Sequence, residues 1–471
     1  MTRFLAALCL SVCVAWVGPV QAQNNGVAQH GDLRTYAQMQ AAGDVRMAVP
    51  YDRSIYVDAK GKKIGSAPAI ATYLGKWLSE KYKKPIRVTL VPTLPGQLLQ
   101  SVASGQADFA MGYVDEYAGQ LDPKRYIVYP HPRHEKHVLV SSAAEPAVTN
   151  LAALSGKTIY LGRQTDTTVI DTLNVELKKS GKSPISIYRD RQALDDEDLL
   201  QMLNDGLLPQ ILVANWKADL WRAQLPNIRI NPETATVGAT TEGVIIRTEN
   251  RALADDIMAF VVSPECDKAL TLYRDGDYRS RRNALKNPLS PESWRRYQSM
   301  RPMFERYGKM YGLEPLFVTS LGFQETMLNQ SLVSPMGAIG VMQLLPATGA
   351  SMKVGNIREL EPNIHAGAKY MRSLLDQVAG SEQLTRMERS LFAVAAYNAG
   401  PNNISKARQR AAELGFDPNR WFMNVEMVAA RMVGEETFLY VRNVYKYYVT
   451  YDVNTEKAPE SRDALIKGLR P

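Results

Sequence analysis

The chain has 471 residues, of which 45% are hydrophobic and 22% are charged. This length exceeds what one ordinary hydrophobic core organises, so two or three domains are expected, and the composition excludes a disordered or fibrous protein. The formal net charge of +8 favours an acidic partner such as a cell-wall polymer or anionic lipid, although the same charge also serves simple solubility.

The first residues have the pattern of a secretory signal peptide, predicted at residues 1–22. Arg3 precedes an apolar run over residues 4–17, and a small-residue site follows that ends at Ala22. The run is too short to span a membrane. The two cysteines within it leave with the signal, so the mature chain keeps Cys266 alone and forms no internal disulfide.

Residues 40–275 alternate between short β-rich runs and helical stretches. This alternation predicts βα units around mainly parallel sheets. No glycine-rich phosphate-binding motif follows any of the strands, so nucleotide binding is not expected. The expected strands are residues 44–50, 86–92, 107–114, 137–142, 157–162, 185–190, 210–215 and 243–248, and the expected helices include residues 69–82, 94–105 and 166–181.

The composition of the sequence changes after residue 275. Residues 276–292 are rich in Arg, Asn and Pro and are predicted to be a linker. Residues 293–452 carry apolar residues at three-to-four spacing and are predicted to be mainly helical. Residues 453–471 form a polar tail.

One carboxylate stands in an apolar helix. Pro315 is a natural first helical residue, and a helix starting there places Glu325 on the same face as Val318, Leu321 and Leu328. Burial would raise the pKa of such a glutamate and let it donate a proton to the leaving oxygen of a glycosidic bond. Alternatively, Glu325 is a partly exposed residue at the helix end or is paired with an arginine.

A glycine- and proline-rich turn follows, over residues 334–349. Its glycines let a bulky polymer approach closely, Ser334 and Gln343 supply hydrogen-bonding groups, and Met342 offers an adaptable apolar surface. Farther along, Tyr397 and Asn398 end an apolar helix just before a glycine, where they could hold a carboxylate or an acetamido group. A core tyrosine followed by a glycine cap is the plain alternative.

Together these segments resemble the soluble-lytic-transglycosylase domain, a lysozyme-like fold that acts on bacterial peptidoglycan. The resemblance is carried by "QET" at residues 324–326, "SPMGAIGVMQL" at 334–344, "NIHAGAKYM" at 363–371, "AAYNAG" at 395–400 and "ETFLYV" at 436–441. Thr326 stands where the family more often has serine. The resemblance implies that Glu325 is catalytic and that Ser334, Met342, Gln343, Tyr397, Asn398 and Tyr440 contact substrate.

Residues 40–275 resemble, more loosely, a two-lobed periplasmic solute-binding domain of the amino-acid importer type. The expected fold class is therefore multidomain, an α/β solute-binding part followed by a mainly α lysozyme-like part. Arg125 is placed to grip a ligand carboxylate, with a surface ion pair as the alternative. Thr165, Asp166 and Thr167 are placed to offer a helix N-terminus to the same carboxylate. Asn215 stands where an acidic residue often holds the ligand's amino group, which argues against a free amino acid as the ligand.

Most glycosidases use two carboxylates, yet Glu314 and Glu325 are the only acidic residues between residues 313 and 355, and Glu314 precedes the helix. Glu361 or Glu436 could approach Glu325 in the fold. The resemblance implies instead one glutamate that protonates the oxygen between N-acetylmuramic acid (MurNAc) and N-acetylglucosamine (GlcNAc). It then takes the proton of the muramyl C6 hydroxyl, which closes to a 1,6-anhydro product. No metal or cofactor is expected.

The expected partners are peptidoglycan glycan strands, with a muropeptide or stem peptide as the ligand of the first part, which would regulate or tether the enzyme. The expected location is the periplasm, peripheral to the outer membrane, and nucleic acid is not an expected partner. Two other functions stay open: a non-catalytic peptidoglycan-binding sensor, and nutrient capture for an importer.

Overall fold

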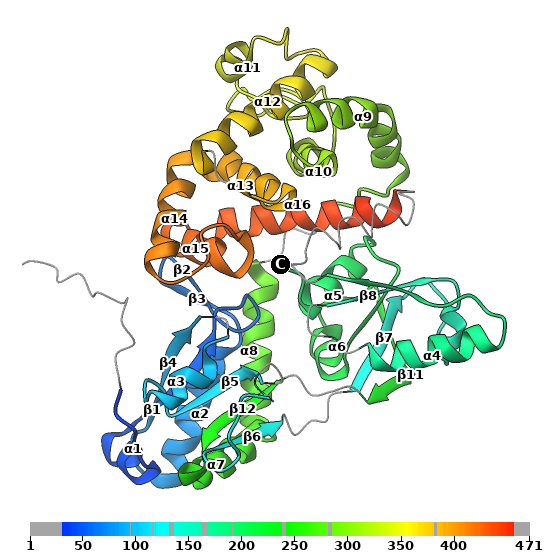
Figure 1. Ribbon diagram of the computed structural model, residues 1–471. Helices are drawn as coiled ribbons and strands as arrows, with labels where there is room; N and C mark the ends of the chain where they lie inside the picture. The colour runs from blue at the N-terminus through cyan, green and yellow to red at the C-terminus, as the bar shows by residue number, and fades with distance from the viewer. Residues whose placement is uncertain are drawn as a thin grey trace, which may run out of the picture.

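A computed structural model describes residues 31–94, 96–114, 117, 119–130, 136–162, 165, 167–190, 193–237, 242–280, 285–380 and 384–455. The predicted signal peptide, most of the predicted tail and Asp166 lie outside these residues. The chain folds into two α/β lobes and a helical region, which lies above both lobes in Figure 1. We call residues 31–130 with 242–280 the first lobe, residues 136–237 the second lobe and residues 285–455 the helical region.

The first lobe is built on a five-stranded sheet in the order β4-β1-β5-β12-β6. Its central strands are apolar on both faces, because helices cover the sheet from both sides. Its strands are β1 (Asp44–Pro50), β4 (Arg87–Thr93), β5 (Phe109–Tyr113), β6 (Tyr126–Pro130) and β12 (Glu242–Arg247), with a separate hairpin of β2 (Val57–Ala59) and β3 (Lys62–Ile64). Its helices are α1 (Tyr36–Ala42), α2 (Ala67–Tyr82), α3 (Leu98–Ala103), α7 (Arg251–Val261) and α8 (Pro264–Ser280).

The second lobe has its own five-stranded sheet, in the order β11-β7-β10-β8-β9. The fully buried strand β10 lies at its centre. The strands are β7 (Lys136–Ser142), β8 (Thr158–Leu161), β9 (Ser186–Arg189), β10 (Gln210–Ala214) and β11 (Ile228–Val237), and the helices are α4 (Thr168–Lys179), α5 (Asp196–Asn204) and α6 (Asn215–Arg222).

Every strand expected from the sequence is present, but the sheets are mixed and not mainly parallel. In the first lobe β1 runs parallel to β4 and β5, whereas β12 runs antiparallel to β5 and β6. In the second lobe β8 runs parallel to β9 and β10, whereas β7 runs antiparallel to β10 and β11. The reason is that the chain crosses between the lobes twice, after β6 and after β11. Each crossing strand joins its new sheet without a βα connection.

The helical region contains the predicted helices and ends in one long helix. The predicted linker is partly helical, because α8 continues to Ser280 and the next helix begins at Pro291. The helices are α9 (Pro291–Met310), α10 (Pro315–Thr326), α11 (Pro346–Met352), α12 (Leu360–Ala379), α13 (Arg386–Ala399), α14 (Pro401–Glu413), α15 (Glu426–Val433) and α16 (Glu435–Asn454). In the described part of the chain, no helix is both long and apolar enough to cross a membrane.

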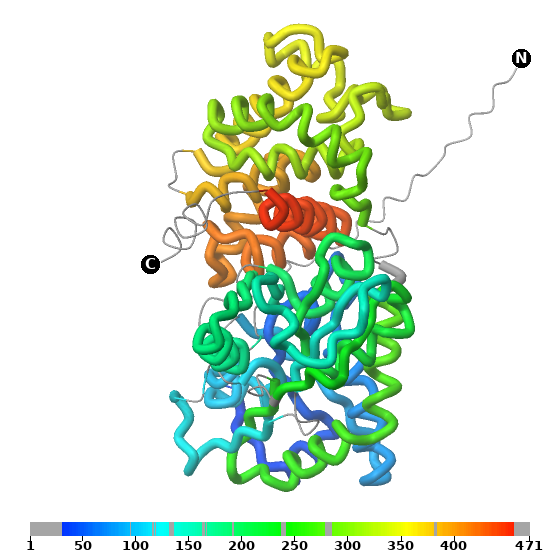
Figure 2. The backbone as a smooth tube through the Cα atoms, turned by 90° about the vertical axis from the view of Figure 1, so that its right-hand side faces the viewer, coloured from blue at the N-terminus to red at the C-terminus, as the bar shows by residue number. Residues whose placement is uncertain are grey.

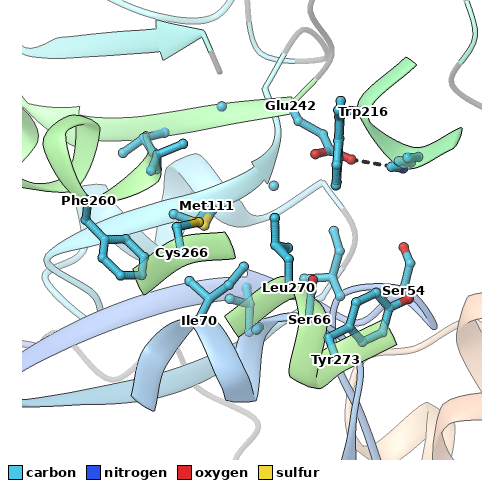
Figure 3. Close-up of a pocket in the computed structure, with 18 of the residues that line it drawn as sticks. Ser54, Ser66, Ile70, Met111, Trp216, Glu242, Phe260, Cys266, Leu270 and Tyr273 are labelled. Atoms are coloured by element: carbon cyan, nitrogen blue, oxygen red, sulfur yellow. Dashed lines mark ion pairs between the residues drawn. The ribbon is translucent and has the colours of Figure 1, made fainter. Parts of the chain in front are cut away.

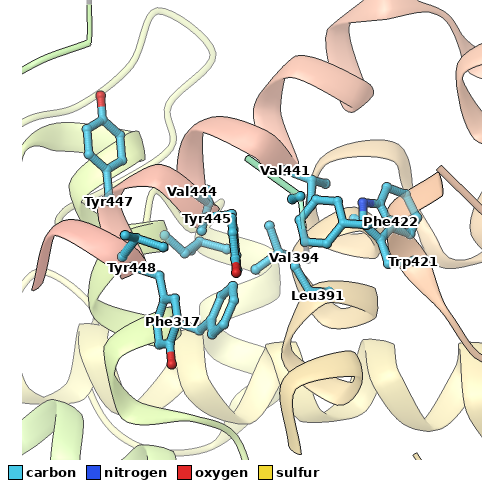
Figure 4. Packing of buried hydrophobic residues seen from close by; sticks show 14 of the residues in the cluster. Phe317, Leu391, Val394, Trp421, Phe422, Val441, Val444, Tyr445, Tyr447 and Tyr448 are labelled. Carbon is cyan, nitrogen blue, oxygen red and sulfur yellow. The ribbon is translucent and has the colours of Figure 1, made fainter. Parts of the chain in front are cut away.

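The apolar cores of the helical region and the second lobe are continuous. One buried cluster includes Val138 and Leu200 of the second lobe together with Phe317 and Tyr448 of the helical region. Figure 4 shows the aromatic part of this cluster around α16, where the rings of Phe317 and Tyr448 stack with centroids 4.3 Å apart. Helix α16 therefore lies between helices α9 and α10 and the second lobe, whereas α15 contacts β2 of the first lobe (Figures 1 and 2).

Candidate active site

The candidate carboxylate stands near the C-terminal end of α10. This helix starts at Pro315, as predicted, and ends after Thr326 because Met327 and Leu328 take positive φ angles of 54° and 59°. Glu325 is the penultimate residue of the helix, and its side chain is half-buried. Burial raises the pKa of Glu325, and a hydrogen bond from Tyr440 lowers it in part. The protonated form that a general acid needs is thereby favoured.

Tyr440, on α16, is the side chain that contacts the carboxylate. Its hydroxyl donates a hydrogen bond to Oε1 of Glu325. The sequence suggested that Tyr397 could hold a carboxylate, but the hydroxyl that binds Glu325 is that of Tyr440. The hydroxyl of Tyr397 donates instead to the backbone carbonyl of Met342, at 2.5 Å. The charge of Glu325 still raises the pKa of Tyr397, second to burial, so the ring lies near the site.

Among the described residues, no second carboxylate contributes to the pKa of Glu325. Glu361 accepts hydrogen bonds from Arg306 and Tyr307, at 2.7 and 2.8 Å, on the exposed side of α9 and α12. Glu436 is exposed in the first turn of α16. For the residues that the structure describes, the arrangement therefore offers one half-buried acid and not an acid paired with a second carboxylate.

The glycine-rich loop is held by its own backbone. Ile339 forms bridges to Val333 and Leu344, and Ser334 accepts a hydrogen bond from the amide of Ala338 through its side chain, at 3.0 Å. The side-chain nitrogen Nε2 of Gln343 donates to the backbone carbonyl of Gly340, at 3.0 Å. Ser334 and Gln343 are half-buried and thus shape the loop, whatever they also offer to a substrate.

Met342 does not offer the apolar surface that the sequence predicted. Its exposed fraction is 0%, because the side chain packs between Gly322 of α10 and Gly367 of α12. A Cβ on Gly367 would lie 2.5 Å from Met342 Cγ, so this glycine is what lets α12 approach the loop. The contribution of Met342 to the site is its backbone carbonyl, which holds Tyr397.

Asn363 and Gln330 were not singled out from the sequence, and they anchor the loop. The buried side chain of Asn363 accepts from the Met342 amide at 2.8 Å and donates to the Ile339 carbonyl at 2.9 Å. Gln330 accepts from the Val341 amide at 3.0 Å. The available signal was an asparagine early in the apolar helix α12, a type of residue that seldom lies buried without hydrogen-bond partners.

Helix α16 also carries buried cations that contact the second lobe. Arg442 binds Glu426 of the helical region at 2.6 Å and Asp198 of α5 at 3.2 Å. Lys446, one turn later, binds Asp198 at 2.7 Å and the Gln201 side chain at 2.9 Å. Burial alone would raise the pKa of Asp198, but the cations around it hold that pKa below its ordinary value.

The first lobe contacts the same charged residues around Asp198 through Arg53. This fully buried residue follows β1 and lies 3.2 Å from Asp277 of α8 and 3.8 Å from Asp198. We call this group the ionic junction; its members are Arg53, Asp198, Asp277, Glu426, Arg442 and Lys446. Through it both lobes contact the helix that presents Tyr440 to Glu325.

The residues predicted to bind a ligand in the first part of the chain do not converge. Arg125 is exposed and lies over the ring of Tyr126, where β6 begins, and Tyr126 pairs with the last residue of β12, Arg247. The second lobe meets this sheet at the opposite end, near Glu242. Arg125 is therefore at the wrong end of the sheet to grip a ligand between the lobes.

The other predicted ligand residues lie in the second lobe. Thr165 is buried. Thr167 comes directly before α4, so the N-terminus of this helix lies where the sequence predicted it. Asn215 begins α6 and is half-buried, beside the pocket-lining residues Trp216 and Lys217. Within the described residues, no group of three metal-ligating side chains is arranged to hold a metal ion.

Comparisons with known proteins agree with the helical site. The family described as "Transglycosylase SLT domain" matches residues 302–419. The chain is 25% identical to a protein of Pseudomonas putida (strain GB-1) over 346 residues, which are 69% of each chain. It is 29% identical to a protein of Haemophilus influenzae (strain PittGG) over 58% of each chain. Both relatives are named "Membrane-bound lytic murein transglycosylase F".

Solved structures align with about half of the chain. An ancestral arginine-binding protein bound to arginine covers 50% of this chain, with 17% identity and a TM-score of 0.31. The periplasmic VFT2 domain of BvgS from Bordetella pertussis covers 52%, with 15% identity and a TM-score of 0.33. The family match and the two named relatives lead to the identification. Residues 302–419 match the transglycosylase SLT domain, and the chain that carries them is similar to proteins named lytic murein transglycosylases.

Proposed function

We propose that the chain cleaves the β-1,4 bond between MurNAc and GlcNAc in peptidoglycan, with Glu325 as the single acid and base. The observation that carries the proposal is the half-buried Glu325, whose pKa is raised by burial and whose carboxylate accepts a hydrogen bond from Tyr440. General acid–base catalysis of this kind contributes roughly 10²- to 10⁴-fold to the rate, about 3 to 5 kcal/mol of the barrier.

The proposed reaction needs no external nucleophile. The Glu325 carboxyl gives its proton to the glycosidic oxygen, the C1–O bond breaks, and GlcNAc leaves with a free hydroxyl at C4. The positive charge at C1 is stabilised by the muramyl acetamido group. The Glu325 carboxylate then removes the proton of the C6 hydroxyl while O6 bonds to C1. The product is 1,6-anhydro-MurNAc, and Glu325 is protonated again.

The neighbouring residues take separate roles in this proposal. Tyr440 orients the Glu325 carboxylate and moderates its pKa. Tyr397 holds the loop through the Met342 carbonyl, and the half-buried Asn398 follows it on α13, at the end that borders the same loop. We assign Asn398 to glycan contact, together with the half-buried side chains of Ser334 and Gln343.

The test is digestion of purified sacculi, with the products identified by mass spectrometry. Wild type should release muropeptides that end in 1,6-anhydro-MurNAc, and Glu325→Gln should release almost none while keeping its melting temperature. Glu361→Gln, which removes an exposed carboxylate of the same domain, is the matched control and should digest normally. Release of anhydro-muropeptides by Glu325→Gln would contradict the assignment. A wild type that binds sacculi and releases nothing would instead indicate a binding sensor.

We further propose that the two lobes bind a small fragment of the wall and thereby regulate or tether the enzyme. The supporting observation is the ionic junction, because a change in the relation of the lobes moves Asp198 and Arg53 against α16. Two global states with different ligand affinity are required. Calorimetry with stem peptides, and sacculus digestion with and without them, test this. We place the protein in the periplasm, peripheral to the outer membrane.

A further inference from the structure

A pocket lies between the first lobe and the second, and none of the predicted ligand residues lines it. Its empty space, including open solvent at its mouth, is about 880 Å³. Most of the wall is apolar and comes from β5, α2, α7 and α8, as Figure 3 shows for Met111, Ile70, Phe260 and Leu270.

The polar end of the pocket is acidic. Lys217 of α6 bridges to Glu242 of β12 at 3.2 Å, which is an ion pair between the two lobes (Figure 3). The same ammonium group lies 3.7 Å from Asp196 and 3.9 Å from Glu197. Three carboxylates thus surround one buried cation. The local field therefore favours a positive group, and the positive charge of Lys217 is already matched by carboxylates.

Two buried polar groups at this end lack hydrogen-bond partners among the described residues. They are Oε2 of Glu197 and the hydroxyl of Tyr273, on residues that are 4% and 7% exposed. A buried polar atom without a partner destabilises the fold, so its presence in a pocket wall needs an explanation. Both line the pocket. A ligand that donates hydrogen bonds at this end would satisfy them.

We propose that this pocket binds a primary amine attached to an apolar body, with the ammonium group on Glu197 and Tyr273 and the body against Ile70, Met111 and Leu270. The pocket offers no cation to a ligand carboxylate, because no arginine is among the lining residues and Lys217 is already paired with Glu242. The proposal rests on ligand binding by the lobes and is independent of the chemistry at Glu325. It replaces the carboxylate grip that the sequence assigned to Arg125.

Proton release should accompany binding. Burial raises the pKa of Glu197 well above its ordinary value, although Lys217 lowers it in part. Asp195 and Asp196 raise it further, and Glu197 in turn raises the pKa of Tyr273. Burial in the free pocket thus favours the protonated form of Glu197. An arriving ammonium favours the carboxylate, and the proton leaves to the buffer.

The test is isothermal titration calorimetry on the mature chain with three probes of similar size: phenethylamine, 2-phenylethanol and 3-phenylpropionate. The amine should bind most tightly, with proton release detected by repeating the titration in buffers of different ionisation enthalpy. Glu197→Gln should weaken amine binding about 10- to 100-fold. Ile70→Trp should remove it by filling the apolar end. Glu80→Gln, on an exposed position of α2, should bind like wild type.

Equal or tighter binding of 3-phenylpropionate, no binding of the amine, or unchanged amine affinity in Glu197→Gln would each overturn the proposal. Because Ile70 is half-buried, a folded Ile70→Trp that still binds the amine would place the ligand elsewhere and would overturn it too. Binding of a stem peptide with no binding of phenethylamine keeps the lobes as a ligand-binding region and refutes this ligand class alone. Sacculus digestion reports on Glu325 separately.

Discussion

Replacement of Tyr440 by phenylalanine should move the pH dependence of the reaction. Tyr440 donates a hydrogen bond to Glu325, and that bond favours the ionised carboxylate. A hydrogen bond to a charged group contributes about 1.5–3 kcal/mol, and one pKa unit corresponds to about 1.4 kcal/mol. Loss of the hydroxyl should therefore raise the pKa of Glu325 by about 1 to 2 units.

The sign of the effect follows from the role of Glu325 as an acid. The protonated form is the active one, so kcat/KM falls as pH rises through the pKa of Glu325 in the free enzyme. In Tyr440→Phe this fall should occur about 1 to 2 pH units higher than in wild type. The assay is the initial rate of anhydro-muropeptide release from sacculi, measured across the pH range at low substrate concentration.

A matched control is Tyr447→Phe on the same helix. The Tyr447 hydroxyl accepts a hydrogen bond from the Lys286 amide at 3.1 Å, away from Glu325. This variant loses a hydroxyl of α16 and should keep the wild-type profile. If the alkaline limb in Tyr440→Phe stays where it is or moves to lower pH, then either Tyr440 does not bind the carboxylate or Glu325 does not act as the acid.

Three further predictions concern stability. Asp198→Ala removes the buried ion-pair partner of Lys446 and should lower the free energy of unfolding by about 3–5 kcal/mol, whereas Glu305→Ala, which removes an exposed i,i+4 partner, should change it by less than about 0.5 kcal/mol in the same denaturant titration. Burial raises the pKa of Glu388 from 4.5 to about 7, so the folded state binds its proton more tightly and stability falls as pH rises between these values. Glu388→Gln should therefore gain up to about 3 kcal/mol relative to wild type from pH 4.5 to pH 8, and equal pH slopes would contradict this. Tyr397→Phe should cost about 1–3 kcal/mol by leaving the Met342 carbonyl unpaired, and its activity profile should not shift in pH as that of Tyr440→Phe does.

Helix α10 and the loop after it could be predicted because their pattern is contiguous. Pro315 fixes where α10 begins, and the glycines that follow fix where the chain turns. Which tyrosine meets Glu325 could not be predicted in this way. Tyr397 and Tyr440 both carry a hydroxyl that could reach the Glu325 carboxylate. Which of them does so depends on how α16 crosses α10, and no local sequence pattern determines that crossing.

The ligand site of the lobes was predicted less well, for a different reason. The resemblance to solute-binding domains assigned Arg125 to a ligand carboxylate. Its position at one end or the other of β6 depends on where the strand starts, and segment lengths do not determine that. Glu197 and Lys217 gave no signal, because a charged residue near a helix start is ordinarily a solvated one. Their burial comes from the packing of one lobe against the other.

The ionic junction constrains how this protein can change over evolutionary time. Arg442 and Lys446 belong to the catalytic part of the sequence, yet their buried counter-ion belongs to α5 of the second lobe. A substitution at Asp198 is therefore tolerable only together with changes on α16. Exchange of α16 for a helix without cations at these two positions would remove Arg442 and Lys446 from this carboxylate. The two parts look separable in sequence, but in the structure each supplies charges that the other needs.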